Sequence, residues 1–579
     1  MTNHFDTYYD TWLGWLDSEG DMKCYTADFE TTTDLEDCRV WAWAVCDIDN
    51  PDDIVRGTDM ASFIDHCEKL VNCKMYFHNL GFDGAFIIDW LERNSWLWTN
   101  KKPAWHHYKT LISDMNQVYA VELYFSEKRY VKIYDSYKIV PLSIANMAKS
   151  YNLPILKGSI DYTAKREVGH ELTDEEIKYI DNDVQIAAMV LKKFFDEHLN
   201  HMTAGSNALY DYKQGCGGHR KFRYAYPVLS EEEDTFIRRA YRGGFTYVNP
   251  KYAGKRVGAG LVFDVNSLYP SVMAAVEGEL LPYGKPMWFD GEPEQDDMRP
   301  LWVASITCVF KLKSEHIPSL QIKDNWRFKP TQYITDSDGM VTLTLTNVDW
   351  ELMLQQYDVE WYQFNGGYSF EASTEQFKDY VNKWTEVKIQ AGKDGNMGLR
   401  SIAKLMLNSL YGKFATRTTV VGRRPVLDPK HDCIVYEDIE PEERDPVYLP
   451  VGVFITSWAR YKTITSAQSV YSRFVYADTD SLHLVGTEMP DLRIDDFKLG
   501  FWAHESTFTD AKFLGAKCYA EEIDGELVVH VSGMPSRCHK EVTLDNFEIG
   551  ARYYGKLYTR RVKGGIVLVE DYMEIRERK

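Results

Sequence analysis

The sequence predicts a multidomain protein in which an α/β part is followed by an α+β part. The chain has 579 residues, 44% of them hydrophobic, which is too many for a single hydrophobic core. Strand-like runs such as MKCYTADFE and RVWAWAVCDI alternate with helical patterns up to about residue 200, which indicates an α/β layout. A glycine-rich break, KQGCGG at 213–218, is typical of a boundary. After residue 261 strands and helices mix.

The later segments each have their own pattern. A β-rich, acidic segment covers roughly 285–375, and a long helical stretch covers about 375–415. A polar loop region follows at 416–448. Hairpin-like strands are predicted over 470–535, and residues 535–579 form a small, mostly strand-like tail.

The charge is uneven along the chain. A net charge of −21 argues against a nucleic-acid partner, and the acids concentrate in EEED (231–234) and EDIEPEERD (437–445), which we predict as solvated loops. From Ile549 onward eight Lys and Arg face four acids. Such a run is usually a solvated face, but basic residues interleaved with aromatic ones favour a nucleic-acid strand. The basic and aromatic residues of this tail are Arg552, Lys556, Arg560, Arg561, Lys563, Arg576, Arg578 and Lys579, with Tyr553, Tyr554 and Tyr558.

Several protein classes are disfavoured by composition. No stretch reaches the roughly 18 consecutive apolar residues of a membrane span, and the first residues show no secretory, twin-arginine or mitochondrial signal. The ten cysteines include no CxxC pair, so we expect reduced thiols in a cytoplasmic compartment and no zinc site.

Four acids lie in three segments of the first part. Asp28 and Glu30 in YTADFETTT are two apart in a predicted strand, so both face one way. Asp83 stands at the start of an apolar-periodic helix. Tyr179 and Asp183 share a helix face at i and i+4. A capping box of Thr173 and Glu176 predicts where that last helix begins.

These four acids suit a pair of divalent metals about 3.5–4 Å apart. One ion would activate a water, which Tyr179 would orient, and the other would stabilise the leaving oxygen of a phosphodiester. The alternative is that each acid is a helix cap or surface residue, which is the commoner role for any one of them. All of them in this order and spacing resemble the DEDD-type 3′–5′ exonucleases with Tyr in the fourth motif.

A second set of polar residues lies in the α+β part. A β-branched strand in VFDVNSLYPS ends at Asp264, and VYADTDS places Asp478 and Asp480 at the predicted tip of a hairpin. Two such carboxylates repel each other unless a cation lies nearby. In LRSIAKLMLNSLYGKF a polar stripe lies on a helix whose other face, with Ile402 and Met406, is apolar. The stripe consists of Arg400, Lys404, Asn408 and Tyr411, and a cationic stripe ending in an aromatic ring suits a triphosphate and a base.

DVNSLYP, KLMLNSLYG and YADTDS resemble motifs A, B and C of the family B DNA polymerases. YRGGF (241–245), KCY (517–519) and HNLGFDGAF resemble the protein-primed subgroup, the phi29-type phage replicases. The resemblance runs from about residue 24 to the C-terminus. It implies an RNase H-like 3′–5′ exonuclease domain followed by a right-hand polymerase with palm, fingers and thumb and two insertions. The implied ranges are 1–205 for the exonuclease, 206–275 and 449–534 for the palm, 276–377 for an insertion contacting terminal protein, 378–415 for the fingers, 416–448 for an insertion giving processivity and strand displacement, and 535–579 for the thumb.

The resemblance also implies roles for the polymerase residues. Asp264 and Asp480 would hold two Mg²⁺ ions, for which Mn²⁺ would substitute, with Asp478 beside them and the Val265 carbonyl as an extra ligand. Tyr269 would exclude a ribose 2′-OH. The other implied nucleotide ligands are Lys404, Asn408, Tyr411, Arg400 and Lys393, the last in the loop AGKDGNMG, which is longer than usual for the family.

DNA contacts and exonuclease roles follow from the same resemblance. Asp28, Glu30 and Asp183 would bind the exonuclease metals, with Asp83 and Tyr179 in the same site and Lys157 from KGSI assisting. The implied DNA contacts are Tyr241, Gly243 and Gly244 for the template, Lys517 and Tyr519 for the primer, and Thr31, His78, Asn79, Phe82, Phe86, Ser136 and Tyr162 for the strand being digested. Two departures from the family pattern are Tyr137, where Leu is expected, and Ser159, where an acid can occur.

We therefore expect a monomeric, processive, strand-displacing DNA-directed DNA polymerase with 3′–5′ proofreading. By resemblance it would use primer–template DNA, dNTPs and a terminal protein primer to replicate a linear phage-type genome in the cytoplasm of a bacterial host. A local basic channel would hold DNA despite the acidic surface. Alternatives are a nuclease with a vestigial polymerase half, a non-catalytic replication scaffold and a reverse transcriptase. The complete set of metal acids disfavours the first two, and the exonuclease set with SLYP disfavours the third.

Overall fold

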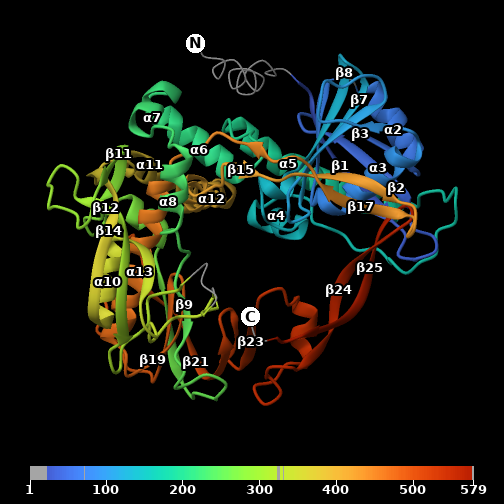
Figure 1. Cartoon of the computed structure of the whole chain (residues 1–579). Helices are drawn as coiled ribbons and strands as arrows, with labels where there is room; N and C mark the ends of the chain where they lie inside the picture. The colour runs from blue at the N-terminus through green and yellow to red at the C-terminus, as the bar shows by residue number, and fades with distance from the viewer. Residues whose placement is uncertain (1–21, 71, 323–326, 330, 577–579) are drawn as a thin grey trace, which may run out of the picture.

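The computed structural model describes residues 22–70, 72–322, 327–329 and 331–576 (Figure 1). Arg578 and Lys579 of the predicted basic tail and the first 21 residues of the chain lie outside this description. The described residues form three sheets of four or more strands, a group of helices and three two-stranded sheets. Within the described residues no helix is long and apolar enough to cross a membrane.

An eight-stranded mixed sheet forms the first part, as the alternating pattern predicts. Its order is β3-β2-β1-β4-β8-β7-β6-β5, with β1 parallel to β4 and antiparallel to β2. Helix α5 packs on β1 and β2, where the Thr26 hydroxyl donates to the Val184 carbonyl at 2.8 Å. The strands are β1 (Cys24–Thr31), β2 (Val40–Asp47), β3 (Ile54–Gly57), β4 (Cys73–Phe77), β5 (Leu97–Trp98), β6 (His107–Ile112), β7 (Val118–Ser126) and β8 (Arg129–Asp135). The helices are α2 (Met60–Lys69), α3 (Leu80–Arg93), α4 (Ile144–Ser150) and α5 (Asp174–Asp196), with the short 3₁₀ helix η1 (Ser136–Lys138) after β8.

Helix starts follow the capping signals of the sequence. The predicted capping box of Thr173 and Glu176 is formed at the first turn of α5. The EEED segment, predicted as a solvated loop, is instead the first turn of α8 (Glu231–Arg238). Ser230 and Glu233 form a capping box there, and acids in a first turn are stabilised by the helix dipole. Helices α6 (Ala204–Gly215) and α7 (His219–Ala225) precede it.

A seven-stranded sheet occupies the middle of the second part. Its order is β23-β22-β21-β10-β20-β19-β9, so the central β10 pairs with strands from the far end of the chain. Helix α13 (Leu449–Ser469) packs against this sheet together with the short α9 (Leu268–Met273). The strands are β9 (Thr246–Val248), β10 (Gly260–Val265), β19 (Phe474–Asp478), β20 (Ser481–Val485), β21 (Trp502–Gly515), β22 (Cys518–Ile523) and β23 (Glu526–Val531).

The β-rich segment expected over 285–375 forms a separate four-stranded antiparallel sheet in the order β11-β14-β12-β13. Its strands are β11 (Leu281–Phe289), β12 (Leu301–Leu312), β13 (Val341–Thr346) and β14 (Tyr357–Ser373), and α10 (Asn347–Gln356) connects β13 to β14. Helix α10 also packs on α13, so this sheet is tied to the central one.

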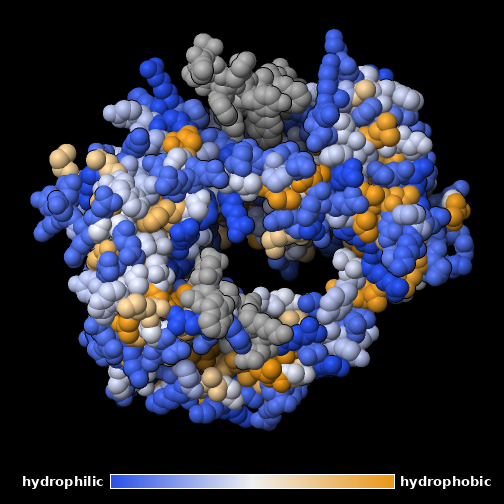
Figure 2. All heavy atoms as spheres, in the orientation of Figure 1, coloured by the Kyte–Doolittle hydropathy of each residue, from blue (hydrophilic) through white to orange (hydrophobic). Residues whose placement is uncertain are grey.

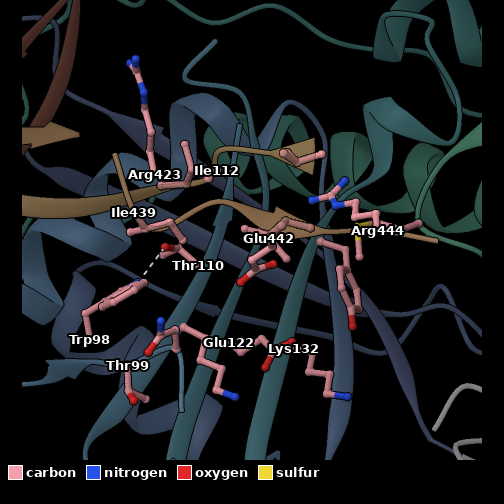
Figure 3. A pocket seen from close by; sticks show the side chains of 18 residues that line it. Trp98, Thr99, Thr110, Ile112, Glu122, Lys132, Arg423, Ile439, Glu442 and Arg444 are labelled. Atoms are coloured by element: carbon pink, nitrogen blue, oxygen red, sulfur yellow. Dashed lines mark hydrogen bonds between the residues drawn. The ribbon is translucent and has the colours of Figure 1, made fainter. Parts of the chain in front are cut away.

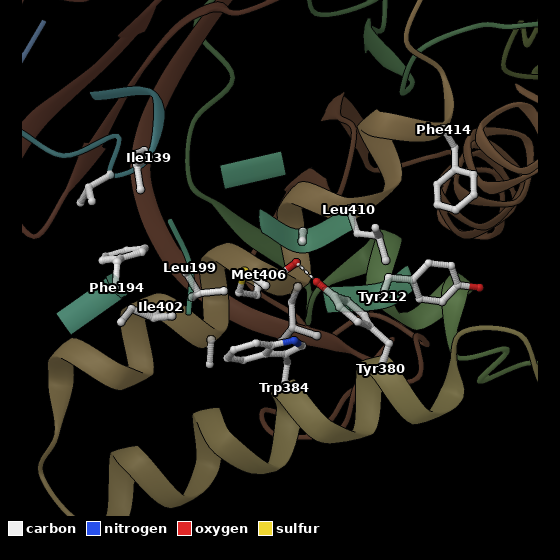
Figure 4. Packing of buried hydrophobic residues seen from close by; sticks show 14 of the residues in the cluster. Ile139, Phe194, Leu199, Tyr212, Tyr380, Trp384, Ile402, Met406, Leu410 and Phe414 are labelled. Atoms are coloured by element: carbon white, nitrogen blue, oxygen red, sulfur yellow. Dashed lines mark hydrogen bonds between the residues drawn. The ribbon is translucent and has the colours of Figure 1, made fainter. Parts of the chain in front are cut away.

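Two helices, α11 (Lys378–Lys393) and α12 (Met397–Phe414), form an antiparallel pair on α6. Their apolar faces share one core with the first sheet, as Ile139 and Phe194 lie in the same cluster as Trp384 and Met406 (Figure 4). The Tyr380 hydroxyl donates to the Met406 carbonyl at 2.8 Å. Lys393 is the last residue of α11, so the loop AGKDGNMG is shorter than the sequence suggested, because the helix continues to that lysine.

Three two-stranded sheets complete the described fold: the hairpin of β16 (Arg423–Asp428) with β17 (Cys433–Asp438), the hairpin of β24 (Arg552–Val562) with β25 (Gly565–Glu574), and the pair of β15 (Thr419–Val420) with β18 (Glu442–Glu443). The short 3₁₀ helix η2 (Ser536–Glu541) precedes β24. Residues 437–445 are thus partly strand rather than loop, and Arg424 pairs with Glu437 at 2.9 Å. Tyr553 is buried because side chains alternate along β24, which corrects its predicted place on an exposed basic face.

The β24–β25 hairpin reaches back to the first sheet. The Gly564 N–H donates to Asp89 on α3 at 3.1 Å, and a Cβ on Gly565 would lie 2.6 Å from the Phe86 ring. Hairpin β16–β17 contacts both α3 and β24. An opening passes through the middle of the molecule between these parts (Figure 2).

Candidate active sites

One candidate site lies at the end of the central sheet. Asp264, at the end of β10, pairs with Ser481 on β20, and the Val265 N–H donates to the Asp480 carbonyl at 2.8 Å. Burial, reinforced by the charges of Asp480 and Glu505, raises the pKa of Asp264 to about 7. Burial also raises the pKa of Asp480. The fold therefore brings two carboxylates together with too little positive charge to balance both.

Asp478 stands beside this pair in a more polar setting. It ends β19, and its Oδ1 accepts a hydrogen bond from the Thr246 hydroxyl at 3.0 Å. Lys517 Nζ lies 3.3 Å from the same oxygen, and the Tyr476 hydroxyl donates to the other oxygen at 3.3 Å. The charge of Asp478 is thus partly balanced within the protein by Lys517, whose charge also acts to lower the pKa of Asp480.

The turn between Asp478 and Asp480 packs so closely on Gly244 that it leaves no room for a side chain there. Thr479 has φ +62°, and its N–H donates to the Phe245 carbonyl at 2.6 Å. A Cβ on Gly244 would lie 2.7 Å from both Cγ2 and Oγ1 of Thr479. The absence of a side chain on Gly244 therefore lets the YRGGF backbone lie directly against this turn.

A buried ion pair is hydrogen-bonded to the backbone of YRGGF. Arg460 on α13 makes hydrogen bonds of 2.8 Å to both carboxylate oxygens of Asp349 on α10. Its other nitrogen donates to the carbonyls of Arg242 at 2.8 Å and Gly243 at 3.0 Å. No local sequence pattern predicts this contact, because its partners come from three segments that are far apart along the chain.

The polar stripe predicted on one helix is present on α12. Arg400, Lys404 and Asn408 are exposed there, while Tyr411 is half-buried and stacks on Tyr269 with ring centroids 3.9 Å apart. The charge of Lys404 acts to lower the pKa of Asp264, so the stripe faces the carboxylates. Lys393 is exposed at the end of α11.

Sequence reasoning missed two charged residues of this site. Burial and the charges of Arg400 and Lys404 lower the pKa of Lys388 on α11, so it lies beside the stripe. Glu505 sits at an irregularity in the pairing of β21 with β10 and raises the pKa of both catalytic candidates. A lysine facing the stripe from the neighbouring helix could have been found by helical periodicity, but the pairing that places Glu505 could not.

The KCY segment packs under the same turn. Lys517 has φ +55°, and its N–H donates to the Tyr476 hydroxyl at 2.9 Å. The Tyr519 ring stacks on Phe513 and on His530 with centroids 5.3 and 4.5 Å apart. Tyr519 is thus part of an aromatic layer beneath Lys517.

A second candidate site lies on the first sheet. Burial and the charge of Asp183 raise the pKa of Asp28 to about 7, and burial with the charge of Asp28 raises those of Glu30 and Asp83. Asp183 Oδ1 is buried without a hydrogen-bond partner, while its other oxygen pairs with Lys157. One lysine therefore offsets part of the charge of four acids.

The tyrosine of this site is held by two neighbours. Tyr179 is buried on α5, and its hydroxyl hydrogen-bonds that of Tyr162. Lys157 Nζ lies 5.0 Å from the centre of the Tyr179 ring. The fold thus brings Tyr179, Tyr162 and Lys157 into one group with Asp183.

The predicted strand-binding residues divide into exposed and structural ones. Burial lowers the pKa of His78 to about 4, and its ring nitrogens bond the Ser136 hydroxyl at 3.0 Å and the Leu142 carbonyl at 2.7 Å. Asn79, with φ +73°, caps α3. Tyr137 is 41% exposed and meets the His78 ring edge-on at 5.4 Å.

Phe86 does not face a strand path in this structure. Its side chain is 1% exposed, because it packs in the core under the tip of the β24–β25 hairpin. This corrects the prediction of a direct DNA contact. Phe82, one turn earlier on α3, is partly buried with its ring 5.6 Å from that of Phe86, and Thr31 ends β1.

The chemistry of both sites fits bound cations. Across the described ranges no three His, Cys, Asp or Glu side chains are arranged to hold an ion alone. Each site nevertheless gathers buried or half-buried carboxylates whose pKa is raised by burial and by neighbouring acids, and Asp183 Oδ1 is buried without a hydrogen-bond partner. Mg²⁺ commonly binds one or two carboxylates plus substrate phosphates, which is what these sites offer.

Known proteins resemble the chain over nearly its whole length. The family described as DNA polymerase type B, organellar and viral, matches residues 64–170 and 163–498. The DNA polymerases of Bacillus phages B103 and phi29 are 44% and 43% identical, over 96% of this chain and 100% and 99% of theirs. The solved structure of phi29 DNA polymerase with primer-template DNA and incoming nucleotide superposes with a TM-score of 0.91 at 42% identity, covering 96% of this chain and all of that one. DNA polymerases of this family generally use divalent metal ions and carry 3′–5′ exonuclease activity. The chain therefore belongs to the organellar and viral type B DNA polymerases and is of the phi29 type.

Proposed function

We propose that the two carboxylate clusters divide the DNA polymerase and 3′–5′ exonuclease activities of this chain between them. Asp264 and Asp480 would carry nucleotidyl transfer, and Asp28, Glu30, Asp83 and Asp183 would carry hydrolysis of the primer end. The observation that carries this proposal is the presence of two separate groups of buried or half-buried carboxylates with raised pKa. Carboxylates whose pKa is raised by burial together with neighbouring charges cluster at functional sites.

In the polymerase site, Asp264 and Asp480 would hold divalent ions, with Asp478 and the Val265 carbonyl beside them. The ions would lower the pKa of the primer 3′-OH and neutralise charge on the phosphates. Lys404, supported by Arg400 and Lys388, would bind the triphosphate of the incoming nucleotide. The Tyr269 ring, fixed by its stack on Tyr411, would exclude a 2′-OH and so select dNTPs.

In the exonuclease site, Asp28, Glu30 and Asp183 would hold the ions that activate a water and stabilise the leaving oxygen. Lys157 would keep Asp183 oriented, and the Tyr179 hydroxyl, positioned by Tyr162, would orient the water. The exposed Tyr137 ring would stack on a base of the strand being digested.

One single and one double substitution separate the two assignments. Asp480→Ala should abolish primer extension and leave digestion of single-stranded DNA intact. Asp28→Ala with Glu30→Ala should do the reverse. Loss of both activities in either variant, or digestion that persists in the second, would contradict the division.

The wider role follows from the homology with phi29-type phage enzymes. Synthesis would be protein-primed and strand-displacing, carried out by a monomer in the cytoplasm of a bacterial host. The segment 276–377 would contact the terminal protein, and 416–448 would help to enclose DNA.

Rolling-circle extension on a primed single-stranded circle, with no helicase or clamp, should give products many circle lengths long. Products that stop after one lap would contradict displacement by this chain alone.

A further inference from the structure

The loop between β5 and β6 carries an exposed aromatic stack that neither candidate site uses. His106 lies between Trp105, at 3.6 Å between ring centroids, and Trp96, at 4.7 Å, and the ring planes tilt by only 14° and 13°. Trp96 is buried and meets Phe125 edge-on, which anchors the stack to the core. Trp105, at the outer end, is 68% exposed. One flat face of an indole is therefore presented to solvent on a fixed support.

Backbone bonds hold this arrangement in place. The Leu97 N–H donates to the His106 carbonyl at 2.9 Å, and the Thr99 N–H donates to the Tyr108 carbonyl at 3.0 Å. His106 adopts φ +53°, a left-handed conformation that His adopts more often than most residues, and its ring lies between those of Trp105 and Trp96. The exposed indole thus projects from a closed loop rather than from a free chain end.

The charge around the stack is opposite to that of the whole protein. Residues 93–113 contain no Asp or Glu, although the chain has a net charge of −21. Lys101 and Lys102 are exposed within the same loop as Trp105, and Lys102 pairs with the exposed Glu127 at 3.0 Å. An exposed pair of this kind holds its lysine weakly. The four basic residues of the segment are Arg93, Lys101, Lys102 and Lys109.

The start of this loop also lines a pocket of about 280 Å³ (Figure 3). The first sheet forms one wall, and the segment 420–444 forms the other. Trp98 lies on the sheet side, where its indole N–H donates to the Thr110 hydroxyl at 3.0 Å. The charged residues of the two walls are Lys109, Lys132 and Glu122 on the first sheet and Arg423, Arg444 and Glu442 opposite, so cations outnumber acids.

We propose that this loop is a binding site for single-stranded DNA. A base stacks on the outer face of Trp105, and Lys101 and Lys102 contact the flanking phosphates. Stacking on an indole is independent of sequence, which suits an enzyme that copies any template, and paired cations supply the electrostatic part of such sites. The proposal rests on the chain being a DNA polymerase. Two single strands are present during synthesis, the template ahead of the primer end and the displaced strand. Each offers bases that can stack on Trp105 and phosphates that the two lysines can contact.

Three DNA substrates test the proposal on the full chain without divalent metal, so that nothing is cleaved. The first is a primer–template with a short template overhang, the second has a long overhang, and the third has a single-stranded flap on the non-template strand. Trp105→Ala should leave affinity for the first unchanged and lower affinity for the second or third at least about fivefold. Trp105→Phe, which keeps a ring, should lose less. Trp361→Ala removes an indole that is 40% exposed on β14 and serves as the control.

Each outcome has a defined meaning. A loss confined to the long overhang assigns the site to the template strand, and a loss confined to the flap assigns it to the displaced strand. Equal affinities of Trp105→Ala and the wild-type chain for all three substrates would overturn the proposal. So would an equal loss on all three, since that is general damage. Failure of the wild-type chain to bind the first substrate would instead contradict the proposed function.

Salt dependence gives a second, independent readout. Lys101→Ala with Lys102→Ala should reduce the slope of log affinity against log salt by about 1.4 on the substrate that uses the site, because a single strand contributes about 0.7 per neutralised phosphate. The slope on the short-overhang substrate should not change. An unchanged slope on every substrate would exclude the two lysines as phosphate ligands.

Discussion

At the scale of the residue, both candidate sites keep acids in surroundings that favour their protonated form. Burial and neighbouring carboxylates raise the pKa of Asp264 and of Asp28 to about 7. A folded state with raised carboxyl pKa values binds more protons than the unfolded chain between the ordinary value near 4 and about 7. These acids therefore contribute most to the stability of the metal-free protein below that window, and this contribution is lost as the pH rises through it.

This gives a prediction for metal-free protein. Its unfolding temperature should be lower at pH 8 than at pH 6, with a loss of stability on the order of a few kcal/mol. Added Mg²⁺ should restore more stability at pH 8, where the carboxylates are charged. Thermal unfolding at both pH values, with and without Mg²⁺, measures this difference. An Mg²⁺ effect of equal size at both pH values would contradict the proposed ion sites.

Gly244 allows a prediction about a single methyl group. Gly244→Ala places a Cβ 2.7 Å from the Thr479 side chain, so the turn that carries Asp480 must shift. Primer extension should fall at least tenfold, since an error of about 1 Å at reacting groups can cost about a hundredfold. Digestion of single-stranded DNA should not change. Gly215→Ala, where no atom lies within 4 Å, is the matched control. Full extension by Gly244→Ala would show that the turn tolerates the displacement.

At the scale of the element, the sequence was most informative where local chemistry decides the structure. The capping box at Thr173 fixed the start of α5, and the VYADTDS turn formed between β19 and β20 as expected. The same reasoning failed for EEED, because acid content was weighed above the Ser230 cap that begins α8. It also placed Tyr553 on an exposed face, since the alternation of β24 was not used to separate its two sides.

Between elements, the buried pair of Asp349 and Arg460 predicts a selective loss of polymerisation. Asp349→Ala leaves the Arg460 guanidinium buried without its carboxylate, which should cost about 3–5 kcal/mol of stability. The hold of Arg460 on the carbonyls of Arg242 and Gly243 should loosen, so extension should fall while digestion continues. Asp349→Asn, which keeps a hydrogen-bonding side chain, should lose less.

Two assays measure this outcome. Primer extension and single-strand digestion are compared at a temperature where both variants remain folded, as judged by circular dichroism. If Asp349→Ala lowers both activities in parallel, the pair supports the fold generally rather than the YRGGF backbone.

At the scale of the whole molecule, the sequence could predict which acids matter but not how distant parts meet. Asp264 and Asp480 are joined only by the pairing of β10 with β20, and no local pattern specifies that register. No local pattern specifies the position of Glu505 beside Asp264 either, or the packing of the β24–β25 hairpin against Phe86. Motifs identified the chemistry because they encode it locally, whereas these contacts depend on the folded chain.

Two ion pairs of Asp432 join three parts of the molecule and lead to a prediction about processivity, the length of DNA made in one binding event. Asp432, at the tip of hairpin β16–β17, pairs with Arg93 on α3 at 2.7 Å and with Lys563 at the tip of hairpin β24–β25 at 3.2 Å. These contacts lie where the hairpins return to the first sheet beside the central opening (Figures 1 and 2). Asp432→Lys would place three cations together, so the hairpins should separate and products made in one binding event should be shorter.

The measurement is extension of a primed circle with excess competitor DNA added after binding. Addition of the first few nucleotides should proceed at the wild-type rate, because Asp432 pairs with Arg93 and Lys563 and is not one of the residues assigned to either carboxylate cluster. The deficit of Asp432→Lys should shrink as salt rises, since screening weakens repulsion between exposed charges, and Asp432→Asn should fall in between. Products of wild-type length from Asp432→Lys at low salt would mean that the Gly564 and Gly565 packing, not the charges, keeps the hairpins on the first sheet.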